Sequence, residues 1–246
     1  MQDLHERILR AHGGESRWRS LARVAVTADG GGSMFLAHMQ PRPLREADIV
    51  VEPARFRVTI APFEREDRVG VFEPSRVWVQ ERDGRLVGDR GAPGTVTRSL
   101  RHWMVWDNLD LLFVLGISLW QALLLPMMLC RSGVSATEGH DQGDWLDVTL
   151  PGDLPVPAPE QRLYADAKGA LVRAEYAPVA WGRAMRVAQV MEALEGVNGL
   201  VFATRQSMVP CLPGGAPVRG MPRLAWLEFS DLSVDLATPP SRECGE

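Results

Sequence analysis

The chain has 246 residues and contains almost no lysine, few cysteines and no C-x-x-C pair. Lys168 is the only lysine among 27 basic residues, which is typical of a GC-rich genome. The three cysteines, at positions 130, 211 and 244, are too widely spaced to indicate a disulfide framework or a zinc site. The basic residues are scattered among 31 acidic ones, and the formal net charge is −4. A nucleic-acid partner is therefore not expected.

Local motifs for common cofactors and reactions are also missing. The sequence contains no G-x-x-x-x-G-K-[ST], no G-x-G-x-x-G after a strand, no G-x-S-x-G and no H-E-x-x-H. We therefore expect no cofactor and no metal ion. The first twenty residues carry charges where a secretory signal has an apolar stretch, so we expect a cytoplasmic protein.

Short stretches with apolar residues at every second position dominate the chain, and glycine and proline turns separate them. One such stretch, 34–39, is expected to be a strand, and an amphipathic helix is expected over 2–12. The pattern predicts an α+β, β-rich fold: a curved antiparallel sheet of about eleven strands, forming a half-open barrel. We expect one domain over 1–236 and a disordered tail over 237–246.

The run from Leu111 to Leu129 has no charged residue and is long enough to span a bilayer. Glycine, serine, glutamine and proline interrupt it, and strand-rich sequence lies on both sides. We favour a buried or cavity-lining helix pair, inserted centrally and covering the concave face of the sheet, without stable membrane insertion. Pro126 is expected to kink or end the helix near Leu125.

A polar and aromatic cluster precedes this apolar run, with His102, Trp103, Trp106 and Asp107 close together. One interpretation is a helix N-terminus, which Asp107 caps while the indoles fix the entry of the chain. The other is a pocket rim, in which the indoles stack on a ligand and His102 or Asp107 handles a proton. The second interpretation makes His102 and Asp107 the candidate catalytic residues.

Polar residues in the segment that follows Trp181 do not keep a strict alternation with their apolar neighbours. If these groups point into a concave sheet, they indicate a binding cavity. If they lie on an exposed strand face, they are expected to form Arg–Glu pairs with the neighbouring strand. With the aromatic residues named above and two more in the apolar run, the candidate ligand-binding residues are Trp103, Trp106, Phe113, Trp120, Trp181, Arg186, Gln189 and Glu192.

The order of elements resembles the LolA/LolB-like bacterial lipoprotein-carrier superfamily, from about Leu4 to Leu236. The resemblance rests on a helix ending in H-G-G, the stretch WDNLDLLFVLGISLW, the hairpin LYADAKGALVRAEY and the strand NGLVFATR. It looks closest to uncharacterised cytoplasmic members with a W-D-x-L-x-L-x-F segment, matched here from Trp106 to Phe113. The resemblance implies a half-open barrel that is closed by helices and binds acyl chains or other apolar ligands.

Two functions therefore stay open. The first is binding of a hydrophobic or amphipathic small molecule or lipid, such as an acyl-chain, polyketide-like or terpenoid-like compound, in an internal cavity. The second is a cofactor-independent cyclase or isomerase of secondary metabolism that acts on such a substrate in the same cavity. Holding a flexible apolar substrate in a reactive shape can accelerate its reaction, so the missing motifs do not exclude the enzyme.

Overall fold

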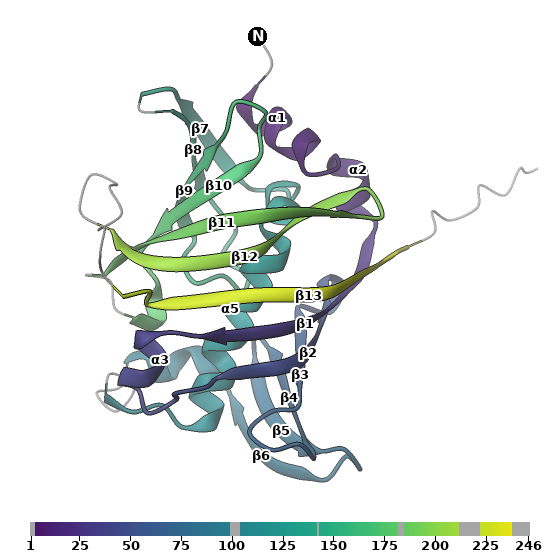
Figure 1. Cartoon of the computed structure of the whole chain (residues 1–246), viewed down its shortest axis with the longest axis vertical. Coiled ribbons are helices and arrows are strands. Elements are labelled where there is room, and N and C mark those ends of the chain that lie inside the picture. Colours follow the sequence, from purple (N-terminus) through teal and green to yellow (C-terminus); the bar gives the residue numbers. More distant parts are fainter. Residues whose placement is uncertain (1–2, 99–103, 142, 182–184, 212–221, 238–246) are drawn as a thin grey trace, which may run out of the picture.

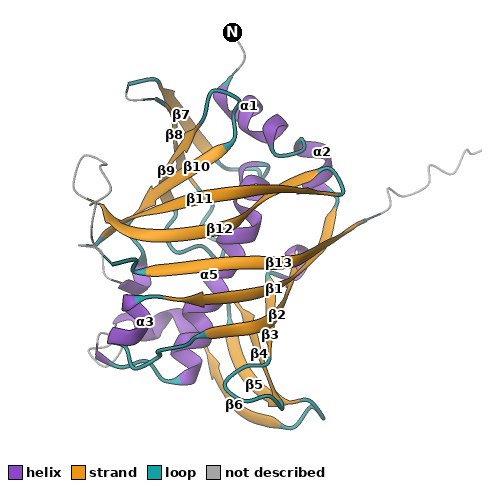
Figure 2. Ribbon diagram, viewed as in Figure 1, coloured by secondary structure: helices purple, strands orange, loops and turns teal. Residues whose placement is uncertain are grey.

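The computed structural model describes residues 3–98, 104–141, 143–181, 185–211 and 222–237. Thirteen strands form one antiparallel sheet (Figures 1 and 2). The strands are β1 (Leu21–Gly31), β2 (Leu44–Glu52), β3 (Arg57–Ala61), β4 (Arg68–Glu73), β5 (Arg76–Glu81), β6 (Leu86–Gly91), β7 (Ser135–Gly139), β8 (Asp144–Thr149), β9 (Glu160–Ala165), β10 (Leu171–Tyr176), β11 (Arg186–Val197), β12 (Leu200–Cys211) and β13 (Ala225–Leu236). The helices are α1 (Leu4–Ala11), α2 (Glu15–Arg19), α3 (Ser33–Ala37) and α5 (Asn108–Leu129), with 3-10 turns η1 (Pro53–Arg55), η2 (Pro93–Arg98) and η3 (Val179–Trp181).

The strand order is β6-β5-β4-β3-β2-β1-β13-β12-β11-β10-β9-β8-β7. The chain therefore runs from the centre of the sheet out to the β6 edge, crosses to the β7 edge and returns strand by strand to the centre. There the first strand, β1, pairs with the last, β13. The crossing from one edge to the other contains α5.

Helix α5 is shorter than the sheet would be wide if it were flat. Its 22 residues span about 33 Å, whereas thirteen flat strands would be about 58 Å wide. Helix α5 contacts β3, β4 and β5 on one side and β12 on the other, so the sheet wraps around it. Figure 1 shows α5 behind β12, β13 and β1, with the strands of the two edges turned away from the central ones.

Helix α5 is apolar on every side because it is surrounded by the sheet and the short helices. It is the one helix among the described residues that is long and apolar enough to span a membrane, and 83% of that stretch is buried inside the protein. The helix packs tightly on the sheet at Gly116, where a Cβ atom would lie 2.2 Å from the ring of Phe72. A glycine there lets the helix and β4 touch.

The expected β-rich class and the central apolar helix are confirmed, but two details of the sheet are wrong. It has thirteen strands rather than about eleven, and it stays open between the β6 and β7 edges. The stretch 34–39 is not a strand, because α3 occupies Ser33–Ala37. A short apolar run fits either element, and here Gly32, at φ 138°, turns the chain out of β1.

The expected helix end near Leu125 is also wrong. Of the expected helix pair the described residues show α5, and residues 99–103 before it lie outside them. Helix α5 passes through Pro126 and ends at Leu129. Proline lacks an N–H, so the carbonyl of Ala122 loses its donor within the helix. The Nε2 atom of Gln206 donates to that carbonyl at 2.8 Å, and the sheet thus supplies the hydrogen bond that Pro126 cannot.

The N-terminal helix is confirmed as amphipathic, with Leu4, Ile8 and Leu9 buried. The buried ring of His12 follows it: the Leu171 N–H donates to Nε2, and Nδ1 lies 3.0 Å from the carbonyl of Val201. Burial lowers the pKa of His12, which suits a neutral ring that accepts at Nε2. The expected tail, 237–246, lies outside the described residues apart from its first residue.

Candidate functional site

Four glutamines form a continuous chain of hydrogen bonds between α5 and the sheet, and we call them the glutamine ladder. Gln161 on β9 donates to Gln121 on α5 at 2.7 Å, and Gln121 donates to Gln189 on β11 at 2.9 Å. Gln189 donates to Gln206 on β12 at 2.6 Å. All four side chains are buried, at 4% exposure or less. Buried amides are stable only when paired, so the ladder fixes the position of α5.

The centre of the ladder is Gln189, which has three side-chain partners. Its Oε1 atom accepts from Gln121 Nε2 and from the hydroxyl of Tyr176, each at 2.9 Å. Its Nε2 atom donates to Gln206. Desolvation in this wholly buried place raises the pKa of Tyr176, so the phenol stays protonated as a donor.

Two small voids lie beside the ladder, one between the middle of α5 and strands β12 and β13, the other between α5, β10, β12 and η3. Each has a volume of about 10 Å³, and both are lined by Ser118, Trp181 and Met208. We call this place the apolar crevice; its other lining residues include Phe35, Leu115, Leu119, Trp226 and Leu227 in one void, and Val114, Ile117, Tyr176 and Ala180 in the other. Gln206 also lines it, so the ladder forms its polar end.

Among the predicted ligand-binding residues that the structure describes, only Trp181 lines this crevice directly, and Gln189 borders it through Gln206 and Tyr176. Trp120 is fully buried on α5, with its ring centre 5.4 Å from that of Phe56. The other predicted aromatic residue of α5, Phe113, is half-buried and lies 6.1 Å from the ring of Phe72. The structure therefore does not gather these aromatic residues in one pocket.

Trp106 lies just before α5, and its ring stacks on that of His38 with the centres 4.1 Å apart. It also meets the ring of Phe35 edge to face, at 5.9 Å. Through Phe35 it borders the crevice from outside. Trp103 and the candidate catalytic His102 fall outside the described residues.

The predicted polar residues share β11 but not one face of it. Gln189 points toward α5, whereas Arg186 and Glu192 are exposed. Glu192 forms an ion pair with Arg205 of the neighbouring strand, with its Oε2 atom 3.0 Å from Nε. That arrangement matches the exposed-face alternative for these two residues.

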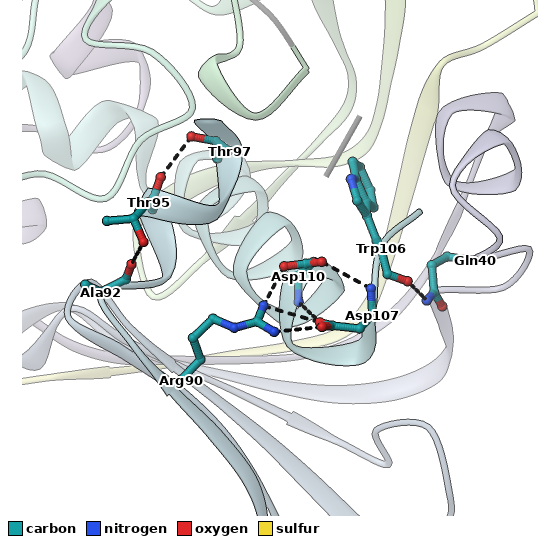
Figure 3. A network of polar contacts seen from close by, with 9 residues as sticks. Gln40, Arg90, Ala92, Thr95, Thr97, Trp106, Asp107 and Asp110 are labelled. Atoms are coloured by element: carbon teal, nitrogen blue, oxygen red, sulfur yellow. Dashed lines mark hydrogen bonds and ion pairs between the residues drawn. The ribbon is translucent and has the colours of Figure 1, made fainter. Parts of the chain in front are cut away.

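Asp107 caps the N-terminus of α5 (Figure 3). Its carboxylate accepts from the Asp110 N–H at 2.9 Å, and the Asp110 carboxylate accepts from the Asp107 N–H at 3.2 Å. The guanidinium of Arg90, from β6, lies between the two, with Nη2 2.7 Å from Asp107 and Nη1 2.5 Å from the buried Asp110. This is the helix-cap alternative that the sequence offered for Asp107. The cap and the ion pairs with Arg90 account for the positions of both carboxylates.

We predict that Asp107→Ala lowers the free energy of unfolding by about 1 kcal/mol, because the helix loses its cap while Asp110 keeps Arg90. Asp107→Asn should cost less, since asparagine caps helices about as well. Urea unfolding followed by circular dichroism measures both variants. Equal losses in the two would show that the charge pair with Arg90, and not the cap, stabilises this end of α5.

A wider groove of about 800 Å³ lies on the outer face of the sheet, across β7 to β11. Charged residues that are already paired cover part of its floor: Arg162 donates to Asp147 at 2.7 and 2.8 Å and lies 4.0 Å above the ring of Trp145. Arg186 lines the same groove, on the side of the sheet away from α5. The two concavities are thus chemically distinct, one apolar and inner, the other charged and outer.

Sequence reasoning missed most residues of the crevice, including Phe35, Ser118, Met208, Trp226 and the ladder partner Gln206. The burial of Gln206 could have been predicted, because Leu200, Phe202 and Met208 share its side of β12 and are buried. A polar residue on an apolar strand face has to be paired inside the protein.

Among the described residues, no group of histidine, cysteine and acidic side chains is arranged to hold a metal ion. The buried thiol of Cys130 has a pKa raised to about 11 by desolvation, so it is protonated at neutral pH.

No family model matches the sequence, and no curated protein matches it. Two solved structures are similar to the chain, each with a TM-score of 0.49 and covering 96% of this chain and 93% of the other. One is a DUF1329 family protein from Desulfovibrio piger, at 10% identity. The other, at 13% identity, is a LolA superfamily protein from Nitrosomonas europaea, a member of the superfamily that the sequence resembles.

Proposed function

We propose that the protein binds a hydrophobic or amphipathic small molecule, such as a lipid or a polyketide- or terpenoid-like compound, in the apolar crevice. The observation that carries this proposal is the composition of the crevice wall. Aromatic and aliphatic side chains cover it, while Ser118 offers a hydroxyl and Oε1 of Gln206, which accepts from Gln189, keeps a second lone pair. A chain-like apolar body with a hydrogen-bonding head group matches that distribution.

The two voids must widen to admit such a ligand, because each holds about one water molecule. The crevice wall contains parts able to move. Met208 has a flexible side chain, and Trp181 belongs to a 3-10 turn of three residues. The opposite wall, α5, is held by its cap and by the glutamine ladder. The ligand therefore enters by displacing the short elements, not the long helix.

The crevice favours a container over the alternative cyclase or isomerase. Among its described lining residues, Tyr176 is the one with a titratable side chain, and its raised pKa keeps it neutral. Acid–base catalysis needs a group that exchanges a proton near neutral pH. With its described lining residues alone, an enzyme in this crevice would act through the shape of the bound substrate.

The direct experiment is native mass spectrometry of freshly purified protein, followed by organic extraction of the bound material. A mixture of fatty acids or lipids would support the carrier function. Conversion of a single bound metabolite on incubation would support the enzyme instead. Protein that carries nothing and takes up no cis-parinaric acid, a fluorescent fatty acid, would contradict both.

We expect Trp181→Ala to weaken binding of cis-parinaric acid by about tenfold or more, because one aromatic wall of the crevice is lost. The matched control is Trp145→Ala, which removes a tryptophan from the outer face of the sheet, where Arg162 covers it. Titration by fluorescence gives the affinity, and urea unfolding confirms that each variant is folded. A folded Trp181 variant with wild-type affinity would remove this residue from the site.

A further inference from the structure

Four exposed apolar side chains lie together at one corner of the molecule, and we call this surface the α3 corner. Leu36 and Met39 belong to α3 and the residues just after it, and they are 63% and 71% exposed. Met104 and Val105 precede α5 and are 72% and 45% exposed. These are among the largest exposures of apolar side chains in the described part of the chain.

The two segments of the α3 corner are held side by side. The Trp106 N–H donates to the carbonyl of His38, and the rings of these two residues stack. Figure 3 shows the second link, from the Gln40 side chain to the carbonyl of Trp106 at 2.9 Å. The exposed side chains are therefore presented on a fixed support and not on a loose loop.

Three arginines lie at the α3 corner. Arg42 and Arg45 follow α3, and Arg223 lies beside its first residue, because the Ser33 N–H donates to the Arg223 carbonyl. All three are exposed, and none forms an ion pair with a described residue. The stretches 33–45, 104–106 and 222–227 contain no acidic residue, and Glu46, Asp107 and Glu228 directly follow them. Asp107 is paired with Arg90, so the three arginines without an ion pair supply the positive charge of the corner itself.

The same helix also borders the crevice. Phe35, next to Leu36, is buried and lines the void between α5 and β13. Trp226 lines the same void. It lies two residues after Leu224, whose carbonyl accepts from the Met34 N–H. Helix α3 therefore lies between the crevice and the α3 corner, which are one helix thickness apart.

We propose that the α3 corner docks on an anionic lipid surface, where α3 and residues 104–105 enter the interface and the arginines contact lipid head groups. This inference rests on the proposed function, since docking would bring the crevice to the source or acceptor of its ligand. Apolar side chains that project singly, with arginines beside them, suit a fluid anionic interface. Docking is peripheral: α5 stays inside the sheet.

The test is flotation of the protein with vesicles of phosphatidylcholine containing 30% phosphatidylglycerol. Wild-type protein should float with these vesicles, bind pure phosphatidylcholine at least tenfold less, and be released by 0.5 M NaCl, which screens the arginines. The double variant Leu36→Gln/Met39→Gln should lose binding at least tenfold. Both side chains are exposed, so the fold is retained.

The control is Leu86→Gln/Val87→Gln, which removes two exposed apolar side chains, 50% and 41% exposed, from the β6 edge. It should bind vesicles like the wild type. Absence of wild-type binding to anionic vesicles, or equal loss in the two double variants, would overturn the proposal. So would concentration-dependent dimerisation that Leu36→Gln/Met39→Gln abolishes, since the corner would then bind a second copy of the chain.

Uptake of cis-parinaric acid in vesicle-free buffer separates this proposal from the function on which it rests. The Leu36→Gln/Met39→Gln variant should bind the free probe like the wild type, because Phe35 and the crevice are unchanged. Normal probe binding without vesicle binding refutes the docking surface alone. Vesicle binding by a wild-type protein that takes up no probe refutes the crevice function and leaves a lipid-docking surface without a cargo.

Discussion

Replacing Gln189 by leucine should lower the free energy of unfolding by about 3 kcal/mol or more. The substitution leaves three buried groups without their partner: Nε2 of Gln121, the hydroxyl of Tyr176 and Oε1 of Gln206. Each buried polar group that loses its hydrogen bond costs about 1–3 kcal/mol. Urea unfolding monitored by circular dichroism gives the difference directly.

The end of the ladder provides the matched control. Gln161→Leu removes two hydrogen bonds, to Oε1 of Gln121 and to the carbonyl of Ala158, and it also removes Oε1 of Gln161, a buried atom with no hydrogen-bond partner among the described residues. Because two partners are left instead of three and one unpaired atom is relieved, this variant should lose less, about 1–2 kcal/mol. A loss at position 189 no larger than the loss at position 161 would show that the ladder does not act as a connected network.

Pro126 connects this polar network to the apolar helix. The proline leaves the Ala122 carbonyl without a donor in the helix, and the side chain of Gln206 donates to that carbonyl instead. In a Pro126→Ala background the helix can supply its own donor, so the cost of Gln206→Leu should fall relative to the wild-type background. The proline thus explains why a glutamine is buried on an otherwise apolar face of β12.

Much of the fold follows from local pattern. Alternating apolar residues identify strands such as Leu44–Glu52 and Arg76–Glu81, because one face of each strand is buried and the other is more exposed. The pattern of 34–39 is ambiguous, since the four apolar residues from Met34 to Ala37 fit a helix turn as well as a strand. Strand order is also beyond local pattern, because the pairing of β1 with β13 joins the two ends of the chain.

The site was harder to predict than the fold, for a physical reason that β11 illustrates. Residues an odd number apart on a strand point to opposite faces, so Arg186 and Gln189 could not both face the helix. The alternation along β11 was therefore enough to predict that Gln189 and Arg186 point to opposite faces of the sheet. It could not reveal that Gln121, Gln161 and Gln206 meet Gln189, because that depends on the register of β9, β11 and β12 and on the position of α5.

Trp120→Ala should lower the free energy of unfolding by about 3–5 kcal/mol, the usual cost of truncating a buried tryptophan. The indole is fully buried and packs on Phe56, so alanine leaves a large cavity between α5 and the residues that follow η1. The sequence had suggested a ligand-facing role for this residue. In that case the variant would remain as stable as the wild type and lose ligand affinity instead.

Trp120→Phe separates the contribution of ring packing from that of the indole nitrogen. Nε1 of Trp120 is buried and has no hydrogen-bond partner among the described residues, so its removal relieves an unpaired donor. Phenylalanine keeps most of the contact with Phe56, and the two effects oppose each other. We expect a loss well below that of Trp120→Ala, with the affinity for cis-parinaric acid unchanged. A folded phenylalanine variant with clearly weaker probe binding would mean that the crevice extends along α5 to position 120.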